Sequence, residues 1–383
     1  MPLMVHVNSS KKKNSTRKEK RVPLLILAQS GRFLAQSATQ AGYRVWVADC
    51  FGDQDMQDVS ERWLTLPPLS TISPKNLSQV LSKLSNGEGC YLICGSGIES
   101  CYDILKKLPT NIKLLGNSFQ TIQAIKNPTL FFNTLEKHQL NFPETVFSPP
   151  TSTTEKRYLA KSSKGLGGIH INYVNNTESY SEDYYFQDFI EGLSGSILFL
   201  ADGNNVQLIS INQQFTVQSD NKSFCLHGIT ADWDIDDKHQ KQLLKAIKLI
   251  TEETGLVGLN SLDFIISNKN ELFILEVNPR PSSSAELIEQ TPRLFQAHLN
   301  ACEGLLPKPN TTDFVASGEL QVLFAGNDYK VASKVSWPIE SYDRPIKDTL
   351  ITKGQPICTI IIKMSSSSFK TIEKNIIEQL SSD

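Results

Sequence analysis

The sequence has few of the features that mark a membrane, metal-storing or nucleic-acid-binding protein. No apolar run approaches the roughly 20 residues needed to span a bilayer. The formal net charge is −2, so no overall charge imbalance points to nucleic acid or a membrane surface. The seven cysteines are scattered, and Cys90, Cys94 and Cys101 fit no zinc spacing. We therefore expect free thiols in a reducing cytosol, and a cytoplasmic protein that uses no cysteine or histidine cluster.

The first 21 residues are polar and basic and offer almost nothing to bury. This composition predicts a disordered tail over residues 1–21. The segment lacks the apolar core of a signal peptide and is rich in lysine, whereas transit sequences are amphipathic and rich in arginine. An RNA-binding or anionic-surface role for the tail is the alternative.

Apolar strands and helices alternate from residue 22 to residue 115. Strands over 22–28 and 43–49 flank a helix over 33–41, which predicts a parallel sheet. A strand over 90–94 is expected to lead into a helix that ends near residue 107. The first loop lacks G-x-G-x-x-G, so there is no dinucleotide-binding fingerprint. Ligands bind at the carboxyl ends of such strands, where turn or capping residues are the alternative; the candidate substrate contacts there are Ser30, Arg32, Ser96 and Glu99.

Two apolar runs, over 258–266 and 271–278, predict a β-hairpin. If Lys269 and Asn270 form a two-residue turn, Asp263 lies opposite Glu276 on the neighbouring strand. Two carboxylates this close on apolar strands would repel each other and would be costly to desolvate. A cation resolves the conflict, although strand-end acids near solvent are the alternative interpretation.

Two further side chains extend this candidate metal site. Asn278 points to the same face of its strand as Glu276, because side chains alternate. Two carboxylates and an amide oxygen suit Mg²⁺ that holds nucleotide phosphates, with Mn²⁺ as a substitute. Arg280 would reach the same region and suits phosphate or carboxylate recognition.

A glycine-rich segment over 162–168 lies between predicted strands over 157–161 and 169–174. Glycines allow positive φ and close backbone approach, so the loop amides can form an anion-binding concavity. Lys161, on the strand before the loop, would place a positive charge on a phosphate. No Gly-Lys-Ser/Thr opens a helix, so this is not a P-loop, and a structural turn is the alternative. The predicted phosphate contacts are Lys161, Ser162, Gly165, Gly167 and Gly168.

Asp263 followed by Glu276-x-Asn278-x-Arg280, with Lys161 about 100 residues upstream, resembles the metal-binding signature of the ATP-grasp ligases. The resemblance spans residues 22–310. It implies an α/β and α+β architecture: a parallel-sheet pre-ATP-grasp domain at 22–115, an ATP-grasp domain of two α+β subdomains at 116–310, and a small β-rich C-terminal domain at 311–383. It also implies that ATP and Mg²⁺ are the cofactors.

The resemblance assigns further positions around the nucleotide. Gln187, Phe189 and Ile190 stand where relatives grip adenine. The acid that usually holds the ribose is missing, and Glu191 is the nearest carboxylate. Relatives carry an Asp-Lys pair near residues 126–128, where this chain has Lys126-Asn-Pro, so Lys126 would serve from a shifted position.

Two serines after Arg280, Ser282 and Ser283, would bind substrate or cap a helix from residue 285. In ATP-grasp enzymes, ATP phosphorylates a carboxylate and an amine then displaces the phosphate. Lys161 and Arg280 would be the catalytic residues. Related enzymes are often dimers, so a homodimer is one possible assembly.

Three functions remain open from the sequence. The wording around Asp263 looks similar to tyramine–glutamate ligase-like enzymes, which attach glutamate or related amino acids during assembly of one-carbon carrier cofactors. A carboxylase or ligase of the purine-biosynthesis type has the same architecture. A nucleotide-binding assembly protein without turnover is the alternative from a different class.

Overall fold

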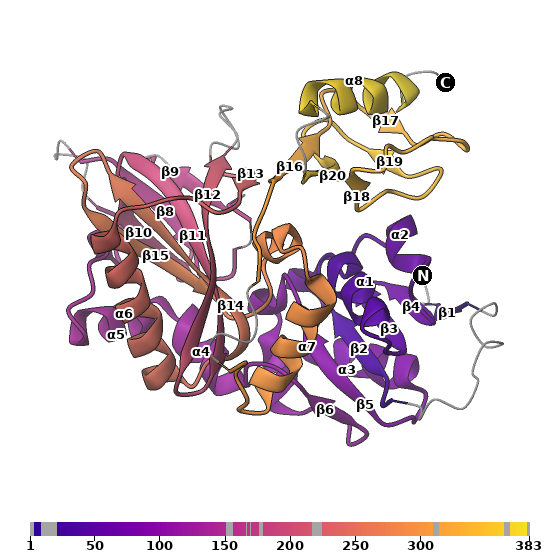
Figure 1. Ribbon diagram of the computed structural model, residues 1–383, viewed down its shortest axis with the longest axis horizontal. Coiled ribbons are helices and arrows are strands. Elements are labelled where there is room, and N and C mark those ends of the chain that lie inside the picture. The colour runs from indigo at the N-terminus through magenta and orange to yellow at the C-terminus, as the bar shows by residue number, and fades with distance from the viewer. Residues whose placement is uncertain are drawn as a thin grey trace. The chain divides into compact units, whose positions relative to one another are not determined.

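The computed structural model describes residues 4–8, 21–150, 156–165, 167–168, 170–175, 179–216, 224–308, 314–363 and 368–380. The chain forms two compact units (Figure 1). The first contains Met1–Gly116, Ser283–Gln296 and Phe314–Asp383, and the second contains Asn117–Ser282 and Ala297–Asp313. Helix α7 (Thr291–Cys302) runs across a boundary between these segments. Among the described helices, none has the length and apolar character required to cross a bilayer.

A six-stranded sheet with the order β1-β4-β3-β2-β5-β6 forms the centre of the first unit. All strands are parallel to their neighbours except β1, which is antiparallel to β4. The β2 residues are fully buried, as expected for a parallel sheet covered on both faces. The predicted parallel sheet is confirmed. Its elements are β1 (His6–Val7), β2 (Leu24–Leu27), α1 (Arg32–Gln40), β3 (Val45–Asp49), α2 (Gln54–Gln57), β4 (Arg62–Thr65), α3 (Pro74–Ser85), β5 (Cys90–Cys94) and β6 (Ile112–Leu114).

Two expectations for this region were wrong. Strand β1 lies within the predicted disordered tail, because His6 and Val7 pair with the edge strand β4 and the His6 ring stacks on Trp63 at 5.4 Å. The rest of the tail, residues 1–3 and 9–20, lies outside the described residues. The helix expected after β5 is instead two 3-10 segments, Ile98–Ser100 and Tyr102–Lys106, because Cys101 between them has non-helical backbone angles.

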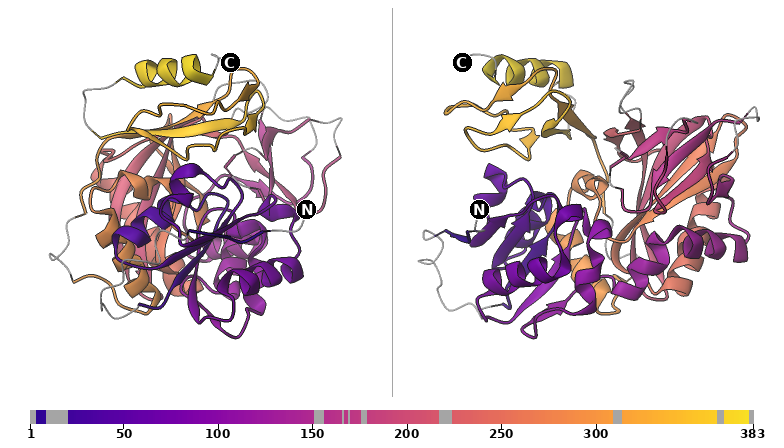
Figure 2. Two further views of the ribbon diagram at one scale, coloured as in Figure 1. Left: turned by 90° about the vertical axis from the view of Figure 1, so that its right-hand side faces the viewer. Right: turned by 180° about the vertical axis from the view of Figure 1, so that it is seen from behind.

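The C-terminal part of the first unit is rich in strands and ends in a helix, as predicted. Strands β16 and β18 both pair with β20, and β17 pairs with β19. Helix α8 packs Ile372, Ile376 and Leu380 on the same core as Leu323 and Ile360, and Figure 2 shows it lying across these strands. The elements are β16 (Glu319–Phe324), β17 (Tyr329–Lys330), β18 (Ser341–Tyr342), β19 (Leu350–Ile351), β20 (Pro356–Ile362) and α8 (Phe369–Leu380).

The second unit contains two antiparallel sheets, as the predicted pair of α+β subdomains requires. One has the order β7-β10-β8-β9, and the other places β15-β14-β11-β12-β13 side by side. A core that includes Phe199, Leu262 and Phe264 packs against Leu243 and Ile247 of helix α6. The elements are α4 (Phe119–Lys126), α5 (Pro128–Lys137), β7 (Thr145–Val146), β8 (Tyr158–Ser162), β9 (Ile171–Tyr173), β10 (Tyr184–Asp188), β11 (Gly192–Asp202), β12 (Val206–Thr216), β13 (Leu226–Thr230), α6 (Asp237–Thr254), β14 (Val257–Ser267) and β15 (Leu272–Asn278).

A helix break at Pro128 sets the position of Lys126. Helix α4 ends at Lys126, and Asn127 is both its last cap and the first cap of α5, where its side chain accepts a hydrogen bond from the Leu130 amide. Pro128 occupies the first turn of α5, where its missing N–H has no helical partner to lose. Lys126 therefore stands at the corner between two helices.

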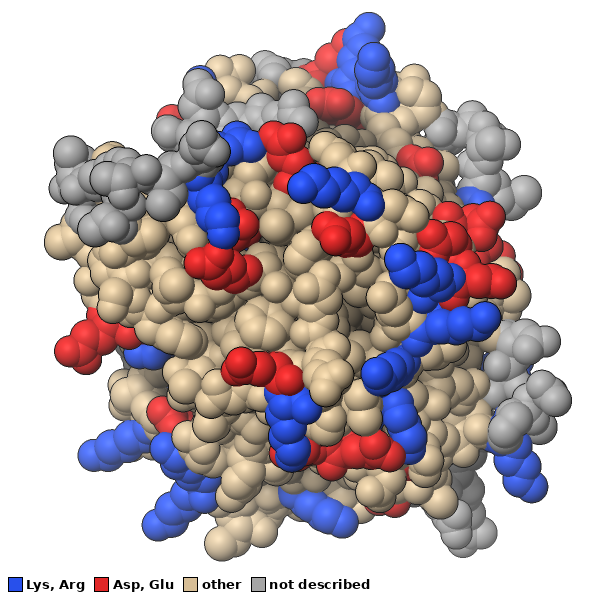
Figure 3. All heavy atoms as spheres, turned by 90° about the vertical axis from the view of Figure 1, so that its left-hand side faces the viewer, with Lys and Arg blue, Asp and Glu red and all other residues tan. Residues whose placement is uncertain are grey.

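Charge is mixed on the surface of the molecule. On the face shown in Figure 3, basic and acidic side chains are interspersed among the described residues. This agrees with the net charge of −2 and offers no extended basic patch on that face.

Arg32, at the start of α1, is buried and joins three segments of the first unit. Its Nε and Nη2 donate to the two carboxylate oxygens of Asp343, at 3.0 and 2.9 Å, and its Nη1 donates to Glu286. Burial raises the pKa of Glu286 to about 7, even though the charge of Arg32 opposes that shift. Burial also acts against the Asp343 carboxylate, but Arg32 holds the pKa of Asp343 below its ordinary value. With 2% of its surface exposed, Arg32 is engaged inside the first unit, and its contact with substrate stays a prediction.

We expect Arg32→Ala to destabilise the protein by about 3–5 kcal/mol, because Asp343 and Glu286 would remain buried without their cation. The matched control is Arg44→Ala, which removes a partly exposed arginine from Glu61 and Glu88 and should change stability by about 1 kcal/mol or less. Denaturant titration followed by circular dichroism measures both free energies of unfolding. Equal losses in the two variants would contradict the role of Arg32.

Candidate functional site

The β14–β15 hairpin brings Asp263 opposite Glu276, as predicted, but by a different turn. Ile266 pairs with Leu272, and the Ser267 amide donates to the Glu271 carbonyl at 2.8 Å, so residues 268–270 form a three-residue turn. Asn270 adopts a left-handed φ of 60° within it. The two-residue turn predicted from the sequence is therefore wrong. A β-bulge between Asp263 and Phe264 inserts one extra residue on β15 and restores the pairing.

Three of the predicted residues form one hydrogen-bonded chain. The Asn278 amide donates to Asp263 Oδ2 at 3.0 Å, and Arg280 Nη2 donates to Asn278 Oδ1 at 3.3 Å. Gln214 of β12 donates to the other Asp263 oxygen at 3.2 Å. The site therefore draws on three strands, and Gln214 was missed because nothing in its local sequence marks it.

The two facing carboxylates have opposite electrostatic environments. Burial, followed by the charge of Glu276, raises the pKa of Asp263. Burial also opposes ionisation of Glu276, but the ammonium groups of Lys126 and Lys161 outweigh it and hold the pKa of Glu276 well below its ordinary value. The Glu276 side chain is 44% exposed, so it faces an opening and not a closed core.

The donor set fits a hard divalent cation. The described residues contain no group of three or more His, Cys, Asp and Glu side chains arranged to hold a metal. The candidate set has two carboxylates, Asp263 and Glu276, and its third oxygen comes from the Asn278 amide. The carbonyl oxygen of Asn278 has a second lone pair beyond its bond to Arg280. Such a set suits Mg²⁺, which keeps water and phosphate oxygens as its other ligands.

Lys126 reaches the site from the end of α4. Its Nζ lies 3.1 Å from Glu276 Oε2, and only 10% of its side chain is exposed. The sequence left open whether a lysine two residues before Pro128 could serve this region. The corner between α4 and α5 answers that question, because it directs Lys126 onto Glu276.

Lys161 is buried on β8 and is held by Gln187. Its Nζ donates to Gln187 Oε1 at 2.7 Å, and Gln187 Nε2 donates to Thr145 at 3.1 Å. Burial lowers the pKa of Lys161 to about 8, although Glu276 and Asp263 oppose this shift. The Gln187 side chain was predicted to contact adenine, but both ends of its amide are occupied inside the protein. The contact of Gln187 with adenine stays a prediction, and in this structure Gln187 positions Lys161.

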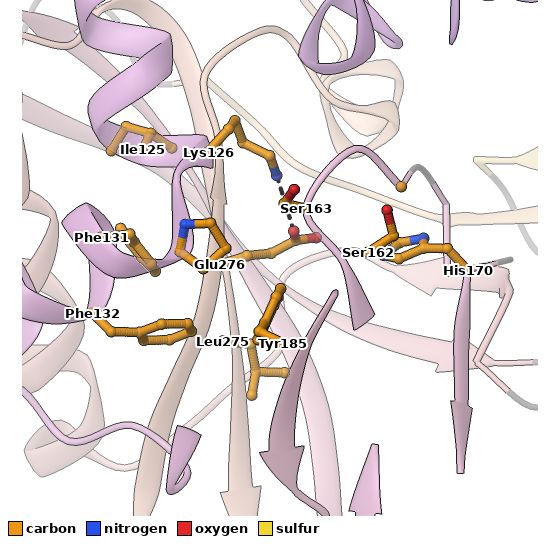
Figure 4. A pocket seen from close by; sticks show the side chains of 12 residues that line it. Ile125, Lys126, Phe131, Phe132, Ser162, Ser163, His170, Tyr185, Leu275 and Glu276 are labelled. Carbon is orange, nitrogen blue, oxygen red and sulfur yellow. Dashed lines mark hydrogen bonds and ion pairs between the residues drawn. The ribbon is translucent and has the colours of Figure 1, made fainter. Parts of the chain in front are cut away.

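A pocket opens beside Glu276 (Figure 4). Its apolar side consists of aromatic and aliphatic side chains from α4, α5, β10 and β15, and its polar side consists of Lys126, Glu276 and the start of the glycine-rich segment. Figure 4 shows Lys126 and Glu276 pointing toward each other across it. The lining residues are Ile125, Lys126, Pro128, Phe131, Phe132, Ser162, Ser163, Gly165, His170, Tyr185, Leu275 and Glu276.

The glycine-rich segment depends on glycine where it approaches other backbone. Gly167 and Gly168 have φ values of 63° and 81°, and a Cβ on Gly168 would lie 1.9 Å from the Phe224 carbonyl oxygen. The Ser162 hydroxyl donates to Asp183 at 2.8 Å, which anchors the start of the loop. Residues 166 and 169 lie outside the described residues.

The segment over 187–191, predicted to hold the nucleoside, contacts Arg157. The Arg157 guanidinium lies 4.5 Å from the centre of the Phe189 ring and pairs with Glu191 at 2.6 Å. Both charged side chains are more than half exposed, and Ile190 is partly buried. Contacts of Phe189, Ile190 and Glu191 with adenine or ribose stay predictions.

The other predicted substrate residues have partners within the first unit. Ser30 donates to Asp343 at 3.0 Å, the Ser30 amide donates to Ser96 at 3.4 Å, and the Glu99 carboxylate accepts from the Gly97 amide at 3.0 Å. The local contact of Glu99 favours the turn alternative for that residue, and substrate contact by Ser30 and Ser96 stays a prediction.

The two serines after Arg280 do not cap the expected helix. Ser283 is exposed and begins a 3-10 segment, Ser283–Leu287, so the helix expected from residue 285 starts only at Thr291. Ser282 is partly buried. Substrate contact by Ser282 and Ser283 stays a prediction.

Comparison with known proteins identifies the architecture. Residues 125–284 match the family model of the ATP-grasp domain. The chain is 23% identical over 376 residues to an uncharacterised protein of Methanocaldococcus jannaschii, which covers 93% of this chain and 91% of that relative. It is also 22% identical over 247 residues to tyramine–L-glutamate ligase of the same organism. That alignment covers 63% of this chain and 73% of the ligase.

Solved structures show the same fold. N5-carboxyaminoimidazole ribonucleotide synthetase from Thermotoga maritima matches with a TM-score of 0.64 over 93% of this chain and 97% of that chain, at 15% identity. The predicted fold class, a parallel N-terminal sheet followed by an ATP-grasp fold of α+β subdomains, is confirmed by the sheet order and this match. Residues 125–284 therefore carry an ATP-grasp domain, and the chain is similar to ATP-dependent ligases and carboxylases that contain this domain.

Proposed function

We propose that the protein is an ATP- and Mg²⁺-dependent ligase that activates a carboxylate as an acyl phosphate and couples it to an amine. The observation that carries the proposal is the facing pair Asp263–Glu276, with Lys126 and Lys161 acting on the same carboxylate. Two acids and two lysines that interact electrostatically provide for both parts of a metal–polyphosphate complex. Use of ATP and Mg²⁺ is typical of the superfamily.

The residues divide the work of phosphoryl transfer between them. Asp263, Glu276 and Asn278 would hold Mg²⁺, which neutralises charge on the phosphate oxygens when bound. Lys161 and Lys126 would bind the phosphate chain, and the pocket wall of Phe131, Phe132, Tyr185 and Leu275 would exclude water. Arg280, held beside Asn278, would stabilise the transferred phosphoryl group and the later oxyanion.

The reaction has two balanced steps. A substrate carboxylate oxygen attacks the γ-phosphorus of ATP, and the bond to the β-phosphate oxygen breaks to release ADP. The neutral amine nitrogen then attacks the acyl carbon, the carbon–oxygen bond to phosphate breaks, and the nitrogen loses a proton to solvent. The products are an amide or peptide bond, ADP and phosphate. No cysteine or serine nucleophile is required.

An amino-acid substrate, with glutamate as the first candidate, is supported by the similarity to tyramine–L-glutamate ligase. On this basis we propose a role in the assembly of a one-carbon carrier cofactor. The similarity to N5-carboxyaminoimidazole ribonucleotide synthetase supports the purine-type alternative through the fold. An ATP-binding protein without turnover is the third candidate, and the intact set from Asp263 to Arg280 argues against it.

Location and partners follow from the same proposal. All seven cysteines are free, and five of them are buried, which supports a reducing cytoplasmic setting. The partners would be a small-molecule carboxylate and an amine. A homodimer is also proposed, and no surface is assigned to its interface.

ADP and phosphate release with Mg²⁺–ATP tests the function directly. The assay uses a panel of amino acids, other amines and carboxylates, and purine intermediates. We expect release that depends on one carboxylate–amine pair, with the coupled product seen by mass spectrometry. Release with bicarbonate and a purine intermediate would favour the carboxylase alternative, and binding without any release would contradict ligase activity for the substrates in the panel.

We expect Glu276→Gln to abolish Mg²⁺-dependent turnover without altering the fold, because it removes a metal ligand whose side chain is 44% exposed. Glu271→Gln is the matched control, since this exposed residue lies on the same hairpin away from the pocket. Turnover is measured as ADP release and the fold by circular dichroism. Full activity in Glu276→Gln would refute the site.

A further inference from the structure

We propose that His170 binds the phosphate chain of the nucleotide, from the far end of the glycine-rich segment. The inference rests on the proposed ATP site and adds a residue that the sequence did not single out. His170 stands two residues beyond Gly168, just before β9. Figure 4 shows its ring beside Ser162, on the side of the pocket opposite Phe131.

The first observation is that the imidazole ring of His170 packs directly against Gly165. A Cβ on Gly165 would lie 1.9 Å from Cγ of His170, and 2.1 Å from both Cδ2 and Nδ1. Gly165 is not among the glycines with positive φ, so backbone freedom does not explain why glycine stands there. The space is taken by the ring. Gly165 therefore serves to let His170 lie directly against the backbone of the loop.

The second observation is the direction in which the ring faces. His170 lines the pocket together with Ser162, Ser163, Lys126 and Glu276. Lys126 lies at the end of α4, and His170 lies beyond the glycine-rich segment. Two separate segments therefore place a positive or hydrogen-bond-donating group at one pocket.

This arrangement suits a polyphosphate better than the other ligands of the reaction. A triphosphate presents many oxygens along a chain, and it can accept hydrogen bonds from an imidazole N–H, from lysines and from loop amides together. The nucleoside has no comparable need for three donors. A compact carboxylate substrate would occupy only one of them.

The test is the affinity of His170→Phe for nucleotides, measured by calorimetry. Phenylalanine keeps a flat ring on Gly165 and removes the N–H donor, so the loop should keep its shape. We expect ATP and ADP to bind about tenfold more weakly, as for loss of a hydrogen bond to a charged group, and adenosine to bind as in the wild type. Gly165→Ala, which displaces the ring, should weaken ATP in the same way.

Two further variants separate the outcomes. His138→Phe is the matched control, because His138 lies in the same unit and pairs with Glu253 outside the pocket. Lys161→Ala reports on the ATP site itself. Unchanged ATP affinity in His170→Phe, with weakened binding in Lys161→Ala, would overturn the role of His170 and leave the ATP site standing. Equal weakening of ATP and adenosine would reduce His170 to a packing role and also overturn it. Failure of the wild-type protein to bind ATP would overturn both the inference and the proposed function.

Discussion

The facing of Asp263 and Glu276 across two antiparallel strands is the constraint on which the site depends. Two carboxylates held this way repel each other and lose solvation, and the protein relieves only part of that unfavourable energy. Lys126 and Lys161 stabilise the charge on Glu276, while Asp263 receives mainly neutral donors from Asn278 and Gln214. The imbalance leaves Asp263 with a raised pKa.

Two lysines lie near this pair, and they are held in different ways. Lys126 contacts Glu276 directly, and Lys161 is held back on Gln187 at 2.7 Å. Both lysines are thus fixed before any ligand binds, which reduces the reorganisation needed when phosphates enter. Because Lys126 pairs with a proposed metal ligand, the entry of a metal–nucleotide complex would exchange that ion pair for contacts with phosphate.

Local pattern was enough to predict most of the elements and the facing of Asp263 and Glu276, since strand alternation and helix caps are short-range. Even so, Asp263 and Glu276 were paired through the wrong turn, because a bulge offsets the third turn residue and a bulge leaves no mark in composition. Long-range partners could not be predicted. Arg32 was predicted to contact substrate, but in the structure it pairs with Asp343, 311 positions away. Gln187 was placed at adenine, but in the structure it accepts a hydrogen bond from Lys161. The contact of Lys126 with Glu276 could not be predicted either, because it depends on how the chain turns between α4 and α5.

The most direct test of the central claim is calorimetric titration of ATP with Mg²⁺ and with a chelator, in the wild type and in Asp263→Asn. If Asp263 and Glu276 share a metal on the nucleotide, Mg²⁺ should tighten ATP binding to the wild type by about tenfold or more, as expected for a bridging cation. In Asp263→Asn this gain should vanish while metal-free ATP still binds. Equal affinity with and without Mg²⁺ in the wild type would contradict the account, and so would an undiminished Mg²⁺ effect in the variant.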